Sequence, residues 1–165
     1  MNTKMRQLII ARKDLQMSPG KLAAQCCHAS IAFLTRTLKE SIKGAYYVAG
    51  AHNMEELLNL ISNETEQVLY GVDKDIYDNW ICDIFTKTIC EAKNRNQLLK
   101  AVALAEELGL KENEDFFLIK DACLTELEPE EVDENGNGRV LTCIGFKPLP
   151  DNIIQKISKK YQLYR

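Results

Sequence analysis

The stretch LIIARKDLQMSPGKLAAQCCHA, residues 8–29, decides the fold of this chain. Its first part belongs to the run RQLIIARK at 6–13, which is apolar and rich in β-branched residues and therefore predicts a strand. Turn residues follow, and among them Ser18 suits a helix N-cap and Pro19 the first helical position. The stretch thus predicts a strand that leads directly into a helix.

An apolar stripe with helical spacing continues from this turn. The pattern predicts a helix from Gly20 to about Leu38, with a stripe formed by Leu22, Cys26, Ala29 and Phe33. A strand followed at once by such a helix is the opening of a βα unit, and it indicates an α/β protein.

The rest of the chain continues the alternation of strands and helices. Asn94 and Gln97 form a capping box for a helix that ends at Gly109. The remaining expected segments are a helix over 54–62, a short strand over 66–72, a helical or irregular stretch over 75–84, strands over 85–92, 115–120 and 139–146, and a C-terminal helix from 151. This order predicts an α/β layer fold with a mixed sheet.

Charge is distributed unevenly along the 165 residues. The net charge of −3, from 24 acidic and 21 basic side chains, argues at first against a nucleic-acid partner. However, residues 1–44 carry eight basic and two acidic side chains, and residues 137–165 carry six and one. If the two ends meet in the fold they form a basic face suited to a polyanion, whereas the alternative is that these charges lie on separate solvated faces.

The six cysteines do not predict disulfides or a metal centre. The N-terminus lacks the apolar core of a signal peptide, and no stretch approaches the length of a membrane span. We therefore expect a cytoplasmic protein with reduced, mostly buried thiols. The cysteines also lack the paired spacing of a zinc site, so the sequence predicts no metal and no cofactor.

Polar residues gather on one side of the first helix. Lys21, Gln25 and His28 are four and then three positions apart, which places them on a common face. The turn at Gly20 lacks the earlier glycine and the following Ser or Thr of a P-loop, but a lysine at a helix N-terminus still favours an anion. The alternatives are a solvated helix face and a structural histidine.

A second polar group follows the strand over 115–120. Lys120, Asp121 and Thr125 lie at its carboxyl end, where α/β proteins commonly bind ligands. The alternative is a turn in which the aspartate only caps the loop.

Taken together these segments resemble the type 2 peptidyl-tRNA hydrolases. The block at 8–29 is similar to the family pattern of strand, turn and helix, with its Gly-Lys pair and its glutamine and histidine. The segment 118–122 with Thr125 is similar to a second family motif, and 140–151 to the closing strand and helix. The resemblance implies a three-layer α/β/α fold with a four-stranded mixed sheet.

The resemblance also implies an activity. The reaction would be hydrolysis of the ester between a peptide and the 3′ ribose of tRNA, without a metal, with the basic ends binding the tRNA backbone. Lys21, Asp121 and Thr125 match the functional positions of the family: the lysine would stabilise an oxyanion or hold a phosphate, the aspartate would orient or activate water, and the threonine would hold substrate or water. Supporting positions would be Gly20, Gln25, His28 and Lys120.

The chain also departs from the family pattern. Residues 39–79 resemble an insertion in a single domain spanning 1–165. Substituted family positions are Cys123 for glycine, Ile84-Phe85 for Gly-Gln, Glu91 for lysine, Val140 for threonine and Phe146 for proline. These departures leave two alternatives, a hydrolase-like domain that binds RNA or a protein without chemistry, and a phosphate-binding α/β protein. A homodimer is also left open.

Overall fold

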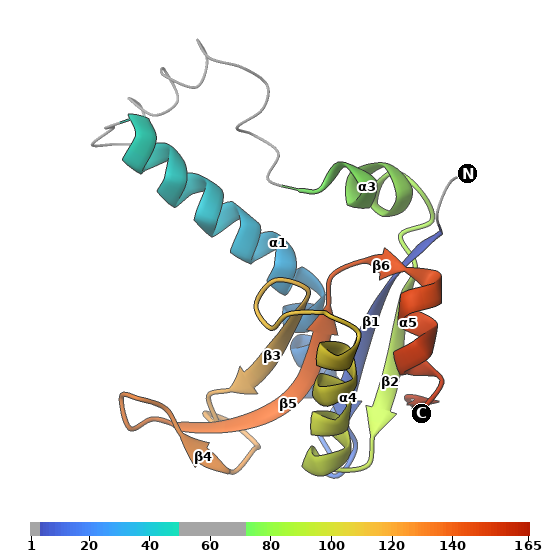
Figure 1. The fold of residues 1–165 in the computed structure, drawn as a ribbon. Coiled ribbons are helices and arrows are strands. Elements are labelled where there is room, and N and C mark those ends of the chain that lie inside the picture. Colours follow the sequence, from blue (N-terminus) through green and yellow to red (C-terminus); the bar gives the residue numbers. More distant parts are fainter. Residues whose placement is uncertain (1–3, 50–71) are drawn as a thin grey trace.

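The computed structural model describes residues 4–49 and 72–165. One mixed sheet runs through this part of the chain in the order β3-β5-β1-β2-β7, with β4 paired to β5 and β6 to β1 (Figure 1). The elements are β1 (Met5–Arg12), α1 (Pro19–Ala49), α3 (Lys74–Ile76), the π-helix η1 (Tyr77–Ile81), β2 (Lys87–Ala92), α4 (Arg95–Glu107), β3 (Phe116–Asp121), β4 (Glu131–Val132), β5 (Gly138–Phe146), β6 (Leu149–Pro150), α5 (Asp151–Ser158) and β7 (Gln162–Leu163).

The prediction of a mixed α/β sheet is confirmed, but the predicted number of four strands is wrong. Strands β1 and β2 are parallel, whereas β5 is antiparallel to both β1 and β3. These four are the predicted strands. The sheet has seven, because β4, β6 and β7 add two residues each, which is too short for any alternating pattern to reveal them in the sequence.

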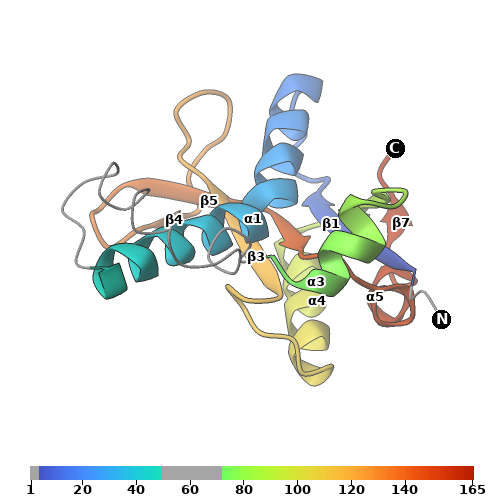
Figure 2. The same cartoon turned by 90° about the horizontal axis from the view of Figure 1, so that it is seen from above.

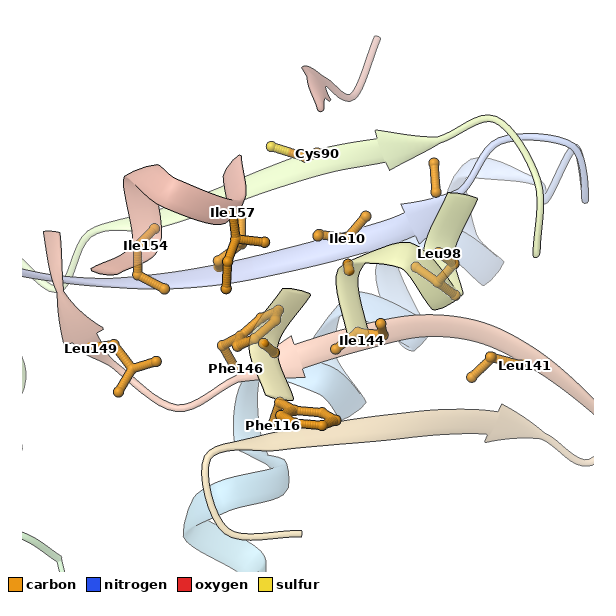
Figure 3. Close-up of a cluster of buried hydrophobic side chains, with 14 residues drawn as sticks. Ile10, Cys90, Leu98, Phe116, Leu141, Ile144, Phe146, Leu149, Ile154 and Ile157 are labelled. Carbon is orange, nitrogen blue, oxygen red and sulfur yellow. The ribbon is translucent and has the colours of Figure 1, made fainter. Parts of the chain in front are cut away.

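Helices cover both faces of the sheet, as expected for three layers. Along β1, Leu8 and Ile10 pack with the side chains of α4 and α5, whereas Ile9 and Ala11 face the opposite way and pack against α1. Figure 2 shows α1 on one side of the strands and α4 with α5 on the other. The core on the α4 and α5 side is the larger and is drawn in Figure 3.

The predicted helix starts are confirmed. Ser18 Oγ accepts a hydrogen bond from the backbone N–H of Lys21 at 3.3 Å, and Asn94 accepts one from the N–H of Gln97 at 2.9 Å. Helix α4 is followed by Gly109 in the left-handed conformation, with φ +80°. Local side-chain chemistry therefore fixes where both helices begin.

Helix α1 is longer than the sequence pattern suggests, since it runs to Ala49 rather than to about Leu38. Residues 39–49 of the expected insertion thus continue the helix, which projects beyond the sheet (Figure 1). The helix expected over 54–62 and all but the last residue of the strand expected over 66–72 lie outside the described residues. The helical expectation for 75–84 is confirmed by α3 and η1, where buried Trp80 packs with Phe33 of α1.

Candidate active site

The three residues expected to carry chemistry meet in space. Lys21 lies in the first turn of α1, Asp121 is the last residue of β3, and Thr125 lies in the loop that follows. Lys21 Nζ is 2.7 Å from Asp121 Oδ2 and 3.0 Å from Thr125 Oγ1. The helix N-terminus and the end of the strand thus form one polar cluster from segments about a hundred residues apart in the sequence.

The carboxylate of Asp121 is held by several donors. Oδ2 accepts hydrogen bonds from Lys21 and from Gln25 Nε2 at 2.8 Å, while Oδ1 accepts one from the backbone N–H of Cys123 at 2.9 Å. Burial alone would raise the pKa of Asp121, but these hydrogen bonds and the charge of Lys21 outweigh it and lower the pKa below its usual range. The aspartate is therefore a stable anion that fixes the ammonium group beside it.

A buried threonine that sequence reasoning missed completes the cluster. Thr142 of β5 is fully buried, and its Oγ1 lies 2.7 Å from Gln25 Oε1. Helix α1 approaches this strand closely at Gly145. A Cβ atom there would collide with the carbonyl of Ala29, so glycine permits the approach. No family motif marks Thr142, and the register shift between β3 and β5 at this position leaves no regular alternation that could have suggested it.

Gly20 is positioned next to the cluster and leaves space there. A side-chain Cβ at Gly20 would meet no atom within 4 Å, so the fold itself does not require glycine at this position. The open volume lies directly before Lys21, at the N-terminus of α1.

Two other expected residues are not brought into the cluster. Lys120 forms an ion pair with Glu131 at 2.5 Å, and strand alternation turns it away from its neighbour Asp121. His28 is exposed, and it makes no hydrogen bond or ion pair within residues 4–49 and 72–165.

The loop that carries Thr125 is anchored at both of its sides. At the end of β1, Arg12 has a side chain only 3% exposed, and its guanidinium donates to both carboxylate oxygens of Glu130 at 2.6 Å. Arg12 lowers the pKa of Glu130, since the charged carboxylate is the form that the guanidinium binds. On the other side, Glu126 accepts a hydrogen bond from the N–H of Ser18 at 2.9 Å.

Comparisons with known proteins identify the family. Residues 5–164 match the family described as peptidyl-tRNA hydrolase PTH2. The chain belongs to this family. A peptidyl-tRNA hydrolase of Methanopyrus kandleri is 30% identical over 160 residues, which cover 97% of this chain and 98% of the relative. Relatives of the same name from Thermococcus sibiricus and Thermoplasma acidophilum are 25% and 23% identical, with coverage of 96–98% of each chain.

The predicted family, fold class and activity are thereby confirmed: the chain is a PTH2-type peptidyl-tRNA hydrolase. The alternative of a domain that only binds RNA or a protein is not favoured. No helix in the described part of the chain is long and apolar enough to cross a membrane. Among the same residues, no group of three or more His, Cys, Asp or Glu side chains is placed to hold a metal ion.

One departure from the PTH2 pattern has a visible structural cost. Cys123, which stands where the family pattern has glycine, adopts φ +54°, a left-handed conformation that glycine reaches without strain. The thiol packs against the apolar cluster of Met17, Leu127 and Val140, and its backbone N–H still reaches Asp121. The chain therefore keeps the backbone geometry of the loop despite the substitution.

Proposed function

We propose that Lys21, Asp121 and Thr125 catalyse the hydrolysis of peptidyl-tRNA. Water adds to the ester carbonyl carbon, and the tetrahedral oxyanion then expels the 3′ oxygen of the ribose. One proton of the added water ends on that oxygen and the other is released to solvent, which gives a free peptide carboxylate and a tRNA with a 3′ hydroxyl. The observation that carries this proposal is the 2.7 Å and 3.0 Å contacts of Lys21 Nζ with Asp121 and Thr125, in a chain of the PTH2 family.

Lys21 is the group suited to the oxyanion. An ammonium group has three N–H donors, of which one serves Asp121 and one serves Thr125. The third is available to a substrate oxygen. Because the side chain is only 15% exposed, this donor acts where water screens it weakly, and it is already oriented before the charge develops.

Asp121 acts mainly by orienting Lys21. Its lowered pKa makes it a weak base, so removal of a proton from water is not its strongest contribution. Its remaining lone pairs can align the attacking water beside the ester.

Thr125 and Gly20 complete the proposed substrate contacts. Thr125 Oγ1 accepts from Lys21, so its own hydroxyl proton is free for a substrate or water oxygen. The open volume at Gly20 lets the ester or the terminal phosphate approach the N–H groups at the start of α1.

The tRNA backbone requires cations that are not already paired. The expected basic ends do meet, since β1 pairs with β5 and β6, but about half of their cations bind acidic groups of the chain, such as Arg12 with Glu130 and Arg139 with Asp133. Several unpaired lysines of the described residues, Lys100, Lys156, Lys159 and Lys160, lie on the α4 and α5 side. We place tRNA phosphates there, where Lys100, Lys160 and Tyr161 line a pocket of about 360 Å³.

Three further expectations belong to this proposal. The chain would work in the cytoplasm. It would fold as one domain, because its buried core contains residues from both ends of the chain. A single cooperative unfolding transition tests the domain, and sedimentation of the purified protein tests the homodimer, which stays a prediction.

The direct test is release of an N-acetylated amino acid from tRNA by the wild type, D121A and T125V. We expect rapid hydrolysis by the wild type and a large loss in both variants. Absence of hydrolysis by a folded wild type that still binds tRNA would refute the hydrolytic activity. Equal turnover by all three proteins would refute the assignment of Asp121 and Thr125 to the site.

A further inference from the structure

A bulge in strand β5 turns Thr142 toward the active site. The pairing of β3 with β5 shifts by one residue between Ile119 and Lys120, from Ile119 opposite Cys143 to Lys120 opposite Leu141. Thr142 is the extra residue on β5. Bulges re-aim side chains, and here Thr142 and Cys143 both face α1, while Leu141 packs on the α4 and α5 side.

The hydroxyl of Thr142 contacts the amide of Gln25 at the end opposite to Asp121. Gln25 is 3% exposed, so both ends of its amide must be satisfied within the protein. Its Nε2 donates to Asp121 Oδ2 at 2.8 Å, and its Oε1 lies 2.7 Å from the hydroxyl of Thr142, which also has the carbonyl of Ile119 within reach as an acceptor at 3.0 Å. The reversed amide would place Oε1 against the carboxylate, with two acceptors facing each other.

We propose that Thr142 is a positioning residue for hydrolysis, which acts through Gln25 to hold Asp121 and Lys21 in their reactive arrangement. The chain of contacts runs from Thr142 to Gln25, from Gln25 to Asp121, and from Asp121 to Lys21. Every step lies between 2.7 and 2.8 Å, and Thr142 is fully buried. The inference rests on the proposed function of Lys21 and Asp121.

The test removes the hydroxyl and keeps the volume. T142V removes the hydroxyl 2.7 Å from Gln25 Oε1, so the amide that donates to Asp121 is held at one end only. We expect kcat for N-acetyl-aminoacyl-tRNA to fall about 10- to 100-fold with KM changed less than about threefold, because orientation rather than substrate contact is lost. T142S keeps a hydroxyl and should restore most of the lost rate.

Two controls separate positioning from general destabilisation. I154V removes a methylene from the core on the opposite face of the sheet, and it should leave kcat within about twofold while lowering stability. In a double-mutant cycle, T142V should have little further effect once Q25A is present, because the hydroxyl then has no amide to orient.

The outcomes are distinct from those that test the proposed function. T142A is assayed in parallel, so that a hydroxyl-free variant is available even if the buried valine lowers stability below the assay temperature. If the wild type hydrolyses the substrate and T142V and T142A match it, or if T142V and Q25A reduce kcat independently, the positioning proposal is overturned. If the wild type itself does not hydrolyse the substrate, the proposed function fails instead.

Discussion

Replacement of Lys21 by methionine separates the charge of the ammonium group from the packing of its stem. The third N–H donor of Lys21 is the one assigned to the oxyanion, so its loss should lower kcat by about 10²–10³, equivalent to about 2.7–4 kcal/mol. The free energy of unfolding should fall less than it would if Asp121 were left as a buried charge without partners, because Asp121 still accepts hydrogen bonds from Gln25 at 2.8 Å and Cys123 at 2.9 Å. We expect a loss of about 1–3 kcal/mol in the free energy of unfolding at neutral pH.

Lys120 provides a matched control for this prediction. It is adjacent to Asp121 in β3, but its ammonium group pairs with Glu131. K120M should change kcat less than about twofold, because its ammonium group pairs with Glu131 outside the cluster, and it should lower the free energy of unfolding by at most about 1 kcal/mol. Single-turnover release of N-acetyl amino acid from tRNA and urea unfolding measure both effects. Equal rates for K21M and the wild type, or an equal loss in K120M, would refute the assignment of the oxyanion donor.

Four other predictions follow from the same geometry. Because the pKa of Asp121 is lowered, its contribution to stability and activity is complete above the ordinary carboxyl pKa of about 4 and is lost as pH falls toward the lowered value. A rate that already declines near pH 6, with the same decline in D121N, would contradict this prediction. G20A should raise KM severalfold while unfolding in urea shows equal or higher stability, by up to about 1 kcal/mol, since the position needs no glycine. E130Q removes half of the charge pair that anchors the Thr125 loop and should cost about 1 kcal/mol in the unfolding free energy, with E128Q on the same loop as the neutral control. The double variant K100E/K160E should weaken tRNA binding and reduce the slope of log K against log salt by about two. The control variant K74E/D78K exchanges the charges of an exposed pair elsewhere and should leave both the affinity and the slope unchanged.

Helical periodicity predicted which site residues share a face, but not what lies opposite them. Lys21 and Gln25 do point into one network, as their four-residue spacing indicates. His28 has nearly the same angular position and is nevertheless exposed. Asp121 and Thr125 stand out at the carboxyl end of a strand, but only the family resemblance joins them to Lys21, since no local pattern brings residue 121 to residue 21.

Features that break a regular pattern were not predictable from the sequence. A bulge reverses the alternation of β5 at Thr142, so a simple period of two would assign its side chain to the wrong face. The continuation of α1 to Ala49 is likewise not set by the apolar stripe, whose packing residues in the described clusters lie between Leu22 and Leu34. Both features depend on tertiary contacts rather than on local propensity.

The fold changes what the distribution of charge along the chain implies for RNA binding. The basic ends lie together, but Arg6, Arg12, Arg139 and Lys147 each bind an acidic group, so a net charge by segment overstates the field available to RNA. Among the unpaired lysines of residues 4–40 and 72–165, four lie on the α4 and α5 side. Because each phosphate contact contributes about −0.9 to the salt slope for duplex nucleic acid, a patch of four lysines predicts a slope near −4 at most. A far steeper slope for wild-type binding would mean that some internal ion pairs open when tRNA binds.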